Sequence, residues 1–324
     1  MAIFGVDIGG TKTAVTLGDH QGNILDKIRF PTETDKGVDH TLERIYQGVE
    51  TLGAAYPGSL ADPVFGISCG GPLDSKRGLV LSPPNLPGWD GIPITELLEK
   101  RFSGRAFLMN DANACALAEW QFGAARGYAN AIFLTFGTGM GAGLILNNQL
   151  YTGTNDLAGE VGHIRLAESG PMGYGKAGSF EGFCSGGGLK NLATTYIQEA
   201  WAKGERVGFC PDEGALVALD ARVVCQAASE GDRHALEIIG TSAKYLGRGL
   251  ALLIDLLNPE IIVIGSIYAR NEALFYPVVK EVLEEECLPG ALAQCQIVPA
   301  KLGEQVGDIA AIATAFYGLK QLEA

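Results

Sequence analysis

Basic residues are scarce in this sequence, which has 24 Lys and Arg against 37 Asp and Glu and a formal net charge of −13. Nucleic acids and anionic membranes bind proteins through concentrated basic surface. We therefore expect neither a nucleic-acid partner nor a membrane partner. An anionic substrate would need locally placed cations or backbone N–H groups.

Paired cysteines and long apolar runs are also missing. The seven cysteines are scattered without a close CxxC pair, so we expect reduced and mostly buried thiols. No apolar run approaches the roughly 18 to 20 residues of a membrane span, and no basic, hydrophobic leader precedes the first strand pattern. Both observations predict a cytoplasmic protein.

Apolar residues are plentiful, at 47% of 324 residues, so the chain can bury a large core and is longer than a typical single domain. Strand and helix patterns alternate along it, which predicts an α/β fold. Strands are expected at residues 2–8, 14–17, 24–30, 64–69, 106–109, 131–136, 141–146, 149–151, 259–264 and 296–300. Helices are expected at residues 38–56, 94–102, 112–122, 189–203, 220–229, 232–257 and 272–286, and from 307 onwards.

Two strand–turn–strand patterns have glycine-rich tips. In the first, Gly9 and Gly10 allow close approach of a phosphate, Thr11 and Lys12 can donate to its oxygens, and Asp7 can hold magnesium through water. In the second, Thr138 and Gly139 are the candidate phosphate contacts. Taken alone, one such tip is as compatible with an ordinary hairpin as with a phosphate-binding loop. Its repetition predicts two similar halves of the chain with a cleft between them.

Asn110 and Asp111 stand where a buried strand pattern passes into a helix pattern. The carboxyl ends of strands in an open α/β sheet line the ligand crevice, so Asp111 is a candidate catalytic base. Asn and Asp before an Ala-rich run are also the usual helix caps, and that alternative stays open. Residues 153–188 are rich in glycine and show little periodicity, which predicts a long functional loop region.

Six motifs, spread from end to end, together resemble the ROK family of sugar kinases, which includes bacterial glucokinases. They are Asp7-Ile-Gly-Gly-Thr-Lys12, Pro84-Asn-Leu-Pro-Gly-Trp89, Asn110-Asp-Ala-Asn-Ala114, Gly137-Thr-Gly139, Ala158-Gly-Glu-Val-Gly-His163 and Gly307-Asp-Ile-Ala-Ala311. The resemblance implies a two-lobed actin-like ATPase (ribonuclease H-like) fold with a central cleft. It also implies a small domain of residues 1–117 and 307–324, and a large domain of residues 118–306.

The resemblance implies roles for individual residues. Asp111 would accept the proton of a sugar 6-hydroxyl as that oxygen attacks the γ-phosphorus of ATP. Sugar hydroxyls would be bound by Gly71, Asn85, Asn110, Asp111, Glu160, His163 and Glu181. The nucleotide and its magnesium would be bound by Asp7, Gly9, Gly10, Thr11, Lys12, Thr138, Gly139, Gly265 and Ala311, with residues 185–188 also on the adenosine side.

Simpler interpretations remain for some of these residues. His163 can be a core histidine, Glu181 a capping acid before Ser185, and Lys12 a solvated side chain. Trp89 is expected to pack under the Pro-rich loop instead of stacking on sugar.

The chain departs from the family at a structural zinc site. Relatives form it from the loop histidine and three cysteines, whereas the corresponding positions here hold Met172, Tyr174 and Ser179. Structural zinc needs about four nitrogen or sulfur ligands, so we expect no zinc. Some other contact is then expected to fix the orientation of His163, and the pose of Glu181 is in doubt.

The resulting hypothesis is an ATP- and magnesium-dependent kinase of carbohydrate metabolism that converts glucose to glucose 6-phosphate. N-acetylmannosamine, N-acetylglucosamine and fructose are alternative acceptors within the family. A non-catalytic sugar-sensing protein is the alternative of another class. It is disfavoured by Asp111 and by both glycine-rich hairpins. The lack of room before Asp7 for the DNA-binding module of ROK repressors, together with the acidic balance, argues against a transcription factor. Relatives are commonly dimers or tetramers, so the resemblance also implies a homo-oligomer.

Overall fold

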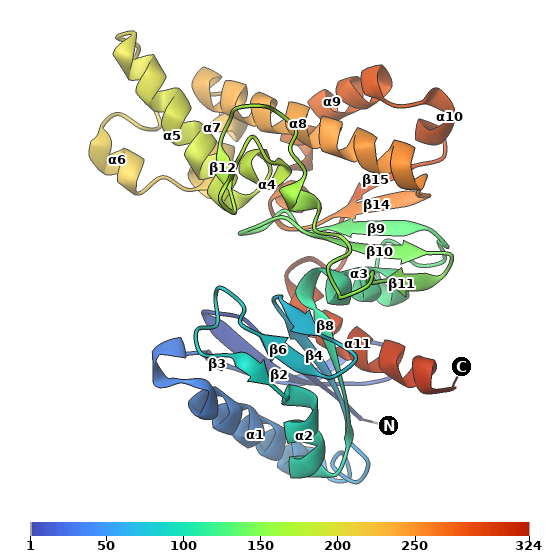
Figure 1. Ribbon diagram of the computed structural model, residues 1–324. Helices are drawn as coiled ribbons and strands as arrows, with labels where there is room; N and C mark the ends of the chain where they lie inside the picture. The colour runs from blue at the N-terminus through green and yellow to red at the C-terminus, as the bar shows by residue number, and fades with distance from the viewer. Residues whose placement is uncertain (1, 324) are drawn as a thin grey trace. The chain divides into compact units, whose positions relative to one another are not determined.

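A computed structural model describes residues 2–323, and Figure 1 shows the order of its helices and strands. The strands are β1 (Ile3–Ile8), β2 (Lys12–Gly18), β3 (Ile24–Pro31), β4 (Val64–Cys69), β5 (Leu73–Asp74), β6 (Leu79–Leu81), β7 (Asp90–Ile92), β8 (Arg105–Asn110), β9 (Ala131–Leu134), β10 (Ala142–Leu146), β11 (Gln149–Tyr151), β12 (Met172–Gly173), β13 (Lys176–Ala177), β14 (Ile261–Ile264) and β15 (Gln296–Pro299).

The α-helices are α1 (Val38–Ala55), α2 (Ile94–Phe102), α3 (Asp111–Phe122), α4 (Phe180–Phe183), α5 (Gly186–Ala202), α6 (Glu213–Val217), α7 (Ala221–Ser229), α8 (Arg233–Leu257), α9 (Ser266–Glu286), α10 (Pro289–Leu292) and α11 (Val306–Glu323). Three short 3-10 helices are η1 (Thr34–Lys36), η2 (Val161–His163) and η3 (Gly303–Gln305). None of the helices within residues 2–323 is long and apolar enough to cross a lipid bilayer.

By its internal contacts the chain divides into two compact units. Unit 1 comprises Met1–Ala129, Gly143–Ala158 and Lys301–Ala324, and unit 2 comprises Asn130–Ala142 and Gly159–Ala300. The domain boundaries expected from the sequence stay a prediction.

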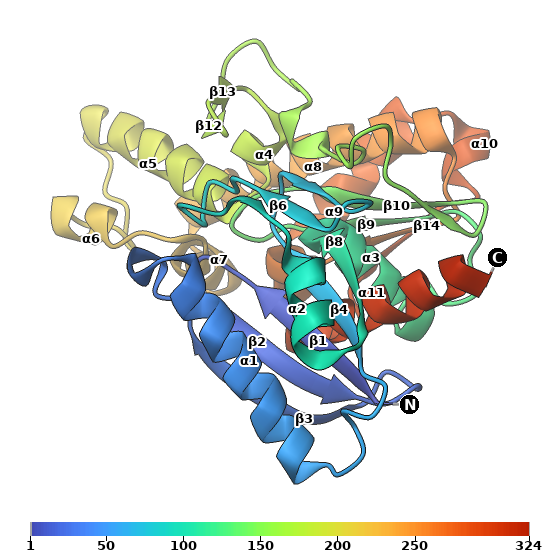
Figure 2. The ribbon, with the colours of Figure 1, turned by 60° about the horizontal axis from the view of Figure 1, so that its bottom comes forward.

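Unit 1 is built on a five-stranded sheet of order β3-β2-β1-β4-β8. The first three strands are antiparallel neighbours, whereas β1, β4 and β8 run parallel. Helices α1 and α2 cover one face of this sheet, as Figure 2 shows, and α11 packs on β1 and β4 from the other face. The second helix on that other face, α3, packs against α11.

The two faces of β1 follow from the alternation of side chains along a strand. Phe4 and Val6 lie in the core cluster that contains Ile45 and Val49 of α1. The intervening Gly5 faces α11 instead, because a methyl group built on it would lie 3.0 Å from the Cβ of Ala311. Glycine on this face therefore lets α11 lie close against the sheet.

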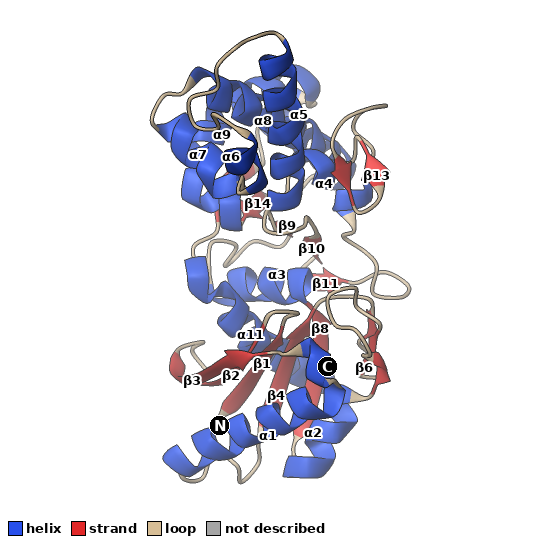
Figure 3. Cartoon of the chain, turned by 90° about the vertical axis from the view of Figure 1, so that its left-hand side faces the viewer, coloured by secondary structure: helices blue, strands red, loops and turns tan. Residues whose placement is uncertain are grey.

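Unit 2 contains β9, β14 and β15, which run parallel to one another. These strands belong to a second sheet, of order β11-β10-β9-β14-β15. Helices make up much of unit 2 (Figure 3), and α8 packs on α9, α7 and α5. The buried strand β14 carries Ile261, Ile262, Val263 and Ile264, an unbroken apolar run typical of a strand covered on both faces.

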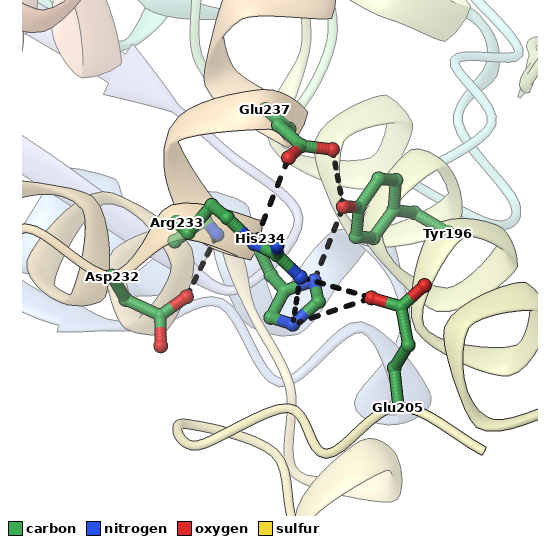
Figure 4. Close-up of polar contacts among 7 residues, drawn as sticks. Tyr196, Glu205, Asp232, Arg233, His234 and Glu237 are labelled. Carbon is green, nitrogen blue, oxygen red and sulfur yellow. Dashed lines mark hydrogen bonds and ion pairs between the residues drawn. The ribbon is translucent and has the colours of Figure 1, made fainter. Parts of the chain in front are cut away.

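A polar cluster joins α5 to the start of α8 within unit 2 (Figure 4). Tyr196 donates its hydroxyl proton to Glu237 at 2.5 Å, and the same oxygen lies 3.1 Å from Nδ1 of His234. Because the hydroxyl has only one proton, the Nδ1–H of His234 donates to it. Burial, followed by the hydrogen bond to Glu237, raises the pKa of Tyr196 to about 12. Arg233 pairs with Glu205 at 3.0 Å in the same cluster.

Most expected elements are confirmed. The short helices α6 and α10 were not expected, and further differences lie in residues 153–188 and at the start of α9. Residues 153–188 contain η2, β12, β13, α4 and the start of α5, all too short to show periodicity. The Pro-rich segment of residues 81–90 is a loop as expected, and only its end residues Leu81 and Asp90 belong to β6 and β7, which pair in a small sheet of order β5-β6-β7. Helix α9 begins at Ser266, six residues before the expected start, because a first helical segment joins the expected one across a kink at the non-helical Asn271. Trp89 is 1% exposed, which confirms its expected packing.

Gly66→Ala tests the close approach of α11 to β4. A methyl group at Gly66 would lie 1.8 Å from the carbonyl oxygen of Ala311. We expect the free energy of unfolding, measured by chemical denaturation, to fall by about 3 kcal/mol. The control is Gly240→Ala in α8, where a methyl group would meet nothing within 4 Å, and this change should stabilise by up to about 1 kcal/mol. Equal effects of the two changes would contradict the packing.

Candidate functional site

The ends of three parallel strands form one row in unit 1. Ile8 of β1 pairs with Cys69 of β4, and Cys69 pairs with Asn110 of β8. The chain therefore leaves the sheet at the same edge three times. The three departing segments are Gly9-Gly10, Gly70-Gly71 and Asn110-Asp111.

Asn110 is the N-cap of α3, and its Oδ1 accepts a hydrogen bond from the backbone N–H of Ala112 at 3.0 Å. This confirms the capping alternative for Asn110. Asp111 is the first residue of the helix, is exposed, and has Oδ1 at 2.8 Å from the same N–H. Because Asn110 caps the helix, Asp111 is not needed as the cap. Its role as a base stays a prediction.

Four of the expected site residues of unit 1 form two neighbouring pairs, Gly10 with Asn85 and Gly71 with Asn110. A methyl group on Gly10 would lie 2.4 Å from the carbonyl oxygen of Asn85, and one on Gly71 would lie 3.2 Å from Nδ2 of Asn110. The first hairpin and the Pro-rich loop are thus in direct contact, and Gly71 leaves space open in front of the Asn110 amide. Asn85 is exposed, as are Thr11 and Lys12.

Asp7 lies among other carboxylates. Burial, and then the charges of Asp308 and Asp111, raise its pKa to about 6, while Lys12 and a hydrogen bond with Ser68 act in the opposite direction. The backbone of α11 approaches this group as well, because a methyl group on Gly307 would lie 3.1 Å from Oδ2 of Asp7.

Asp308 is a neighbour that sequence reasoning did not select. It is 7% exposed and forms an ion pair with Lys27 at 2.5 Å. The available signal was an acid in the first turn of the C-terminal helix, within the Gly307-Asp308 motif. Ala311 of the same helix is 0% exposed and packs against the sheet, and its expected place on the adenosine side stays a prediction.

Magnesium fits the chemistry of these side chains. It prefers oxygen ligands and is usually bound through one or two protein carboxylates together with water and substrate phosphates. Mutually repelling carboxylates such as Asp7 and Asp308 are groups whose charges a divalent cation would offset. Within residues 2–323, no three His, Cys, Asp or Glu side chains lie close enough together to hold a metal ion by themselves.

The second glycine-rich tip lies beside the starts of two helices of unit 2. The N–H of Gly186, in the first turn of α5, donates to the carbonyl of Gly137 at 2.7 Å. The N–H of Ile267, in the first turn of α9, donates to the carbonyl of Phe136 at 2.9 Å. Helix N-termini favour anions, so this placement suits a phosphate at the exposed Thr138.

Two further residues expected on the nucleotide side surround this tip. Gly265 is the N-cap of α9 and is buried. Ser185 is the N-cap of α5, where its Oγ accepts from the N–H of Gly188 at 2.9 Å.

Glu181 connects the expected sugar-binding loop to the second hairpin. It lies in the first turn of α4, and its Oε2 accepts a hydrogen bond from the backbone N–H of Met140 at 3.0 Å. A methyl group on Gly139 would lie 2.8 Å from the same oxygen. Glu160 is the N-cap of the 3-10 helix η2 and His163 is its last residue, and both are exposed, so His163 is not a core histidine.

The residues at the three zinc-site positions do not fit zinc. Met172 and Tyr174 are exposed, Ser179 is buried, and none of them offers a thiolate or imidazole. Ser179 instead caps α4, since its Oγ accepts from the N–H of Gly182 at 3.1 Å. The expected absence of zinc stays a prediction.

Comparison with known proteins gives matches over nearly the whole chain. A model of the ROK family matches residues 3–316. A glucokinase of Thermotoga maritima is 32% identical over 312 residues, which cover 96% of this chain and 96% of that protein. The solved structure of a ROK family glucokinase from Streptomyces griseus in complex with glucose and AMPPNP is 28% identical, with a TM-score of 0.78, and the match covers 98% of this chain and 99% of that chain.

A regulator is among the similar structures as well. A ROK family transcriptional regulator, a homologue of the E. coli MLC protein, is 25% identical with a TM-score of 0.84, and the match covers 100% of this chain and 81% of that chain. These likenesses confirm the expected α/β fold of the actin-like ATPase class.

Asp7→Asn tests the electrostatics of the first hairpin. An acid whose pKa is 3.8 when unfolded and about 6 when folded destabilises the folded state as the pH rises through this window and above it. Asparagine stays neutral, so the variant should be more stable than the wild type at pH 7.5, by about 3 kcal/mol at most. The gain should shrink at pH 4.5. Chemical denaturation in the presence of a chelator measures both values.

Asp62→Asn is the matched control, because this carboxylate lies in the same unit with its side chain 73% exposed. Its stability should follow that of the wild type at both pH values. A similar gain in both variants, or no gain for Asp7→Asn at pH 7.5, would contradict the assignment.

Proposed function

The chain belongs to the ROK family, and from that premise we propose that it is a sugar kinase. It transfers the γ-phosphoryl group of ATP to the 6-hydroxyl of a hexose, with glucose as the first substrate and glucose 6-phosphate as the product. The observation that carries the proposal is the row of strand ends in unit 1, where Gly9-Gly10, Gly71 and Asn110-Asp111 leave the sheet at one edge.

Asp111 is assigned the role of base. As the sugar oxygen attacks the γ-phosphorus, the O–H proton passes to the carboxylate and ADP leaves. Its position at the first residue of α3 supports this role, because Asn110 caps the helix and the carboxylate of Asp111 is exposed. Such a base contributes roughly 10²–10⁴-fold to the rate.

The sugar is assigned to amide, carboxylate and imidazole groups. Asn85, Asn110, Glu160, His163 and Glu181 can each pair with a hydroxyl. An analogue that lacks one hydroxyl would leave one of these polar groups without its partner in the complex, which is how such a site rejects it. The support in the structure is that Gly71 leaves space beside the Asn110 amide and that Glu181 is already fixed by Met140.

ATP is assigned to the two glycine-rich hairpins. Thr11 and Lys12 donate to phosphate oxygens at one tip, and Thr138 with the N–H of Gly139 does so at the other. Asp7, once ionised, would hold magnesium through water. Magnesium would neutralise charge that develops on the phosphate oxygens.

A sugar-responsive regulator without turnover is the second candidate. The observation that favours it is the likeness to a ROK family transcriptional regulator over the whole of this chain. The exposed carboxylate of Asp111 and the two glycine-rich tips support the kinase instead, because sensing a sugar requires neither a base nor a phosphate site.

An ADP-release assay against a panel of hexoses tests the function. The panel contains glucose, fructose, N-acetylglucosamine and N-acetylmannosamine, each with ATP and magnesium. We expect the highest kcat/KM with glucose. Faster turnover of another hexose would replace glucose as the substrate, and binding of a sugar without ADP release would favour the regulator.

Asp111→Asn tests the mechanism. The amide keeps the shape of the side chain and its hydrogen bonding to sugar but cannot take the proton. We expect kcat to fall by roughly 10²–10⁴-fold, with the sugar dissociation constant measured by calorimetry changed little. Asp62→Asn, an exposed aspartate of the same unit, should leave both values at the wild-type level. A kcat of Asp111→Asn near that of the wild type would refute the base assignment.

A further inference from the structure

The imidazole of His163 contacts one side chain ring, that of Tyr174. The ring centroids lie 4.9 Å apart with an interplanar angle of 69°, an edge-to-face arrangement. Both residues are exposed, so burial in a core does not hold either ring in place. Edge-to-face contact between aromatic rings is itself favourable and directional.

Tyr174 occupies an unusual backbone position. Gly173 pairs with Lys176 in the β12–β13 hairpin, which leaves Tyr174 and Gly175 as its two turn residues. Their φ angles are 43° and 74°, as in a type I′ turn, for which asparagine followed by glycine is the preferred sequence. A tyrosine at positive φ carries strain, and Tyr174 as a residue is 65% exposed. Neither the turn nor burial accounts for an aromatic residue here.

The hairpin that carries Tyr174 is anchored to the segment that carries His163. Lys176 Nζ donates to the carbonyl of His163 at 2.6 Å, and Arg165 donates through NH1 to the carbonyl of Ala177 at 2.8 Å. Ser179 donates to the carbonyl of Gly173 at 3.4 Å. These bonds fix the backbone of the hairpin and of the segment that carries His163. They do not restrict the rotation of the imidazole, and the ring of Tyr174 does.

We propose that Tyr174 is the positioning residue for His163. It holds the imidazole through an edge-to-face ring contact, so that this chain orients the histidine without a metal ion. Ser179 and Lys176 hold the loop backbone. The consequence for sugar binding rests on the proposed function, whereas the ring contact does not.

The test compares Tyr174→Asn with Tyr174→Phe. Asparagine suits the turn better than tyrosine, so the hairpin should be kept or stabilised while the ring contact is lost. We expect the NMR signals of the His163 imidazole, assigned by their loss in His163→Gln, to shift and broaden in Tyr174→Asn. With the acceptor sugar, KM should rise about 3- to 10-fold at nearly unchanged kcat. Tyr174→Phe should restore the wild-type signals and KM.

Met172→Ala is the matched control, because Met172 is an exposed apolar residue of the same hairpin. It should leave the His163 signals and KM unchanged. Unaltered signals in Tyr174→Asn would overturn the proposal, as would stoichiometric zinc in the wild-type protein by elemental analysis. If no sugar is phosphorylated or bound, the proposed function fails, and the imidazole signals still decide the ring contact.

Discussion

The parallel register of β1, β4 and β8 is the constraint on which the rest of unit 1 depends. The register is fixed because one face of the sheet carries large side chains and the other carries glycine. Phe4 and Phe65 stack at 5.5 Å on one face, whereas Gly5 and Gly66 face α11 on the other. A slip of one residue would exchange the faces and place a phenylalanine under α11. The alignment of the three strand ends is thus a consequence of core packing.

The same close approach explains the charge at the first hairpin. Because glycine lets α11 lie against β1 and β4, its first turn brings Asp308 near Asp7. Lys27 compensates Asp308 directly, whereas Lys12 only partly opposes the rise in the pKa of Asp7. Repulsion between neighbouring carboxylates destabilises the folded state. Such unfavourable clusters of like charge are typical of sites that bind a ligand of opposite charge.

Periodicity and turn residues were sufficient to predict the long helices and buried strands, because those signals are local. The Asn110-Asp111 pair was also visible, since a strand end and a helix start meet there. The contact between Glu181 and the N–H of Met140 could not be predicted from the sequence, because it joins a side chain to a backbone group 41 residues away. Asp308 was missed for the same reason: its relevance comes from Asp7, which lies almost a whole chain away in sequence.

The replacement of the cysteine positions affects Glu181 and His163, two of the residues expected to bind sugar, unequally. Sequence reasoning placed the doubt on Glu181, yet Ser179 caps its helix and Met140 binds its carboxylate, so two independent contacts fix it. His163 has its carbonyl held by Lys176, but a backbone bond does not determine a side-chain rotamer. Its imidazole therefore depends on the ring of Tyr174, a contact that no periodic or motif signal in the sequence predicts.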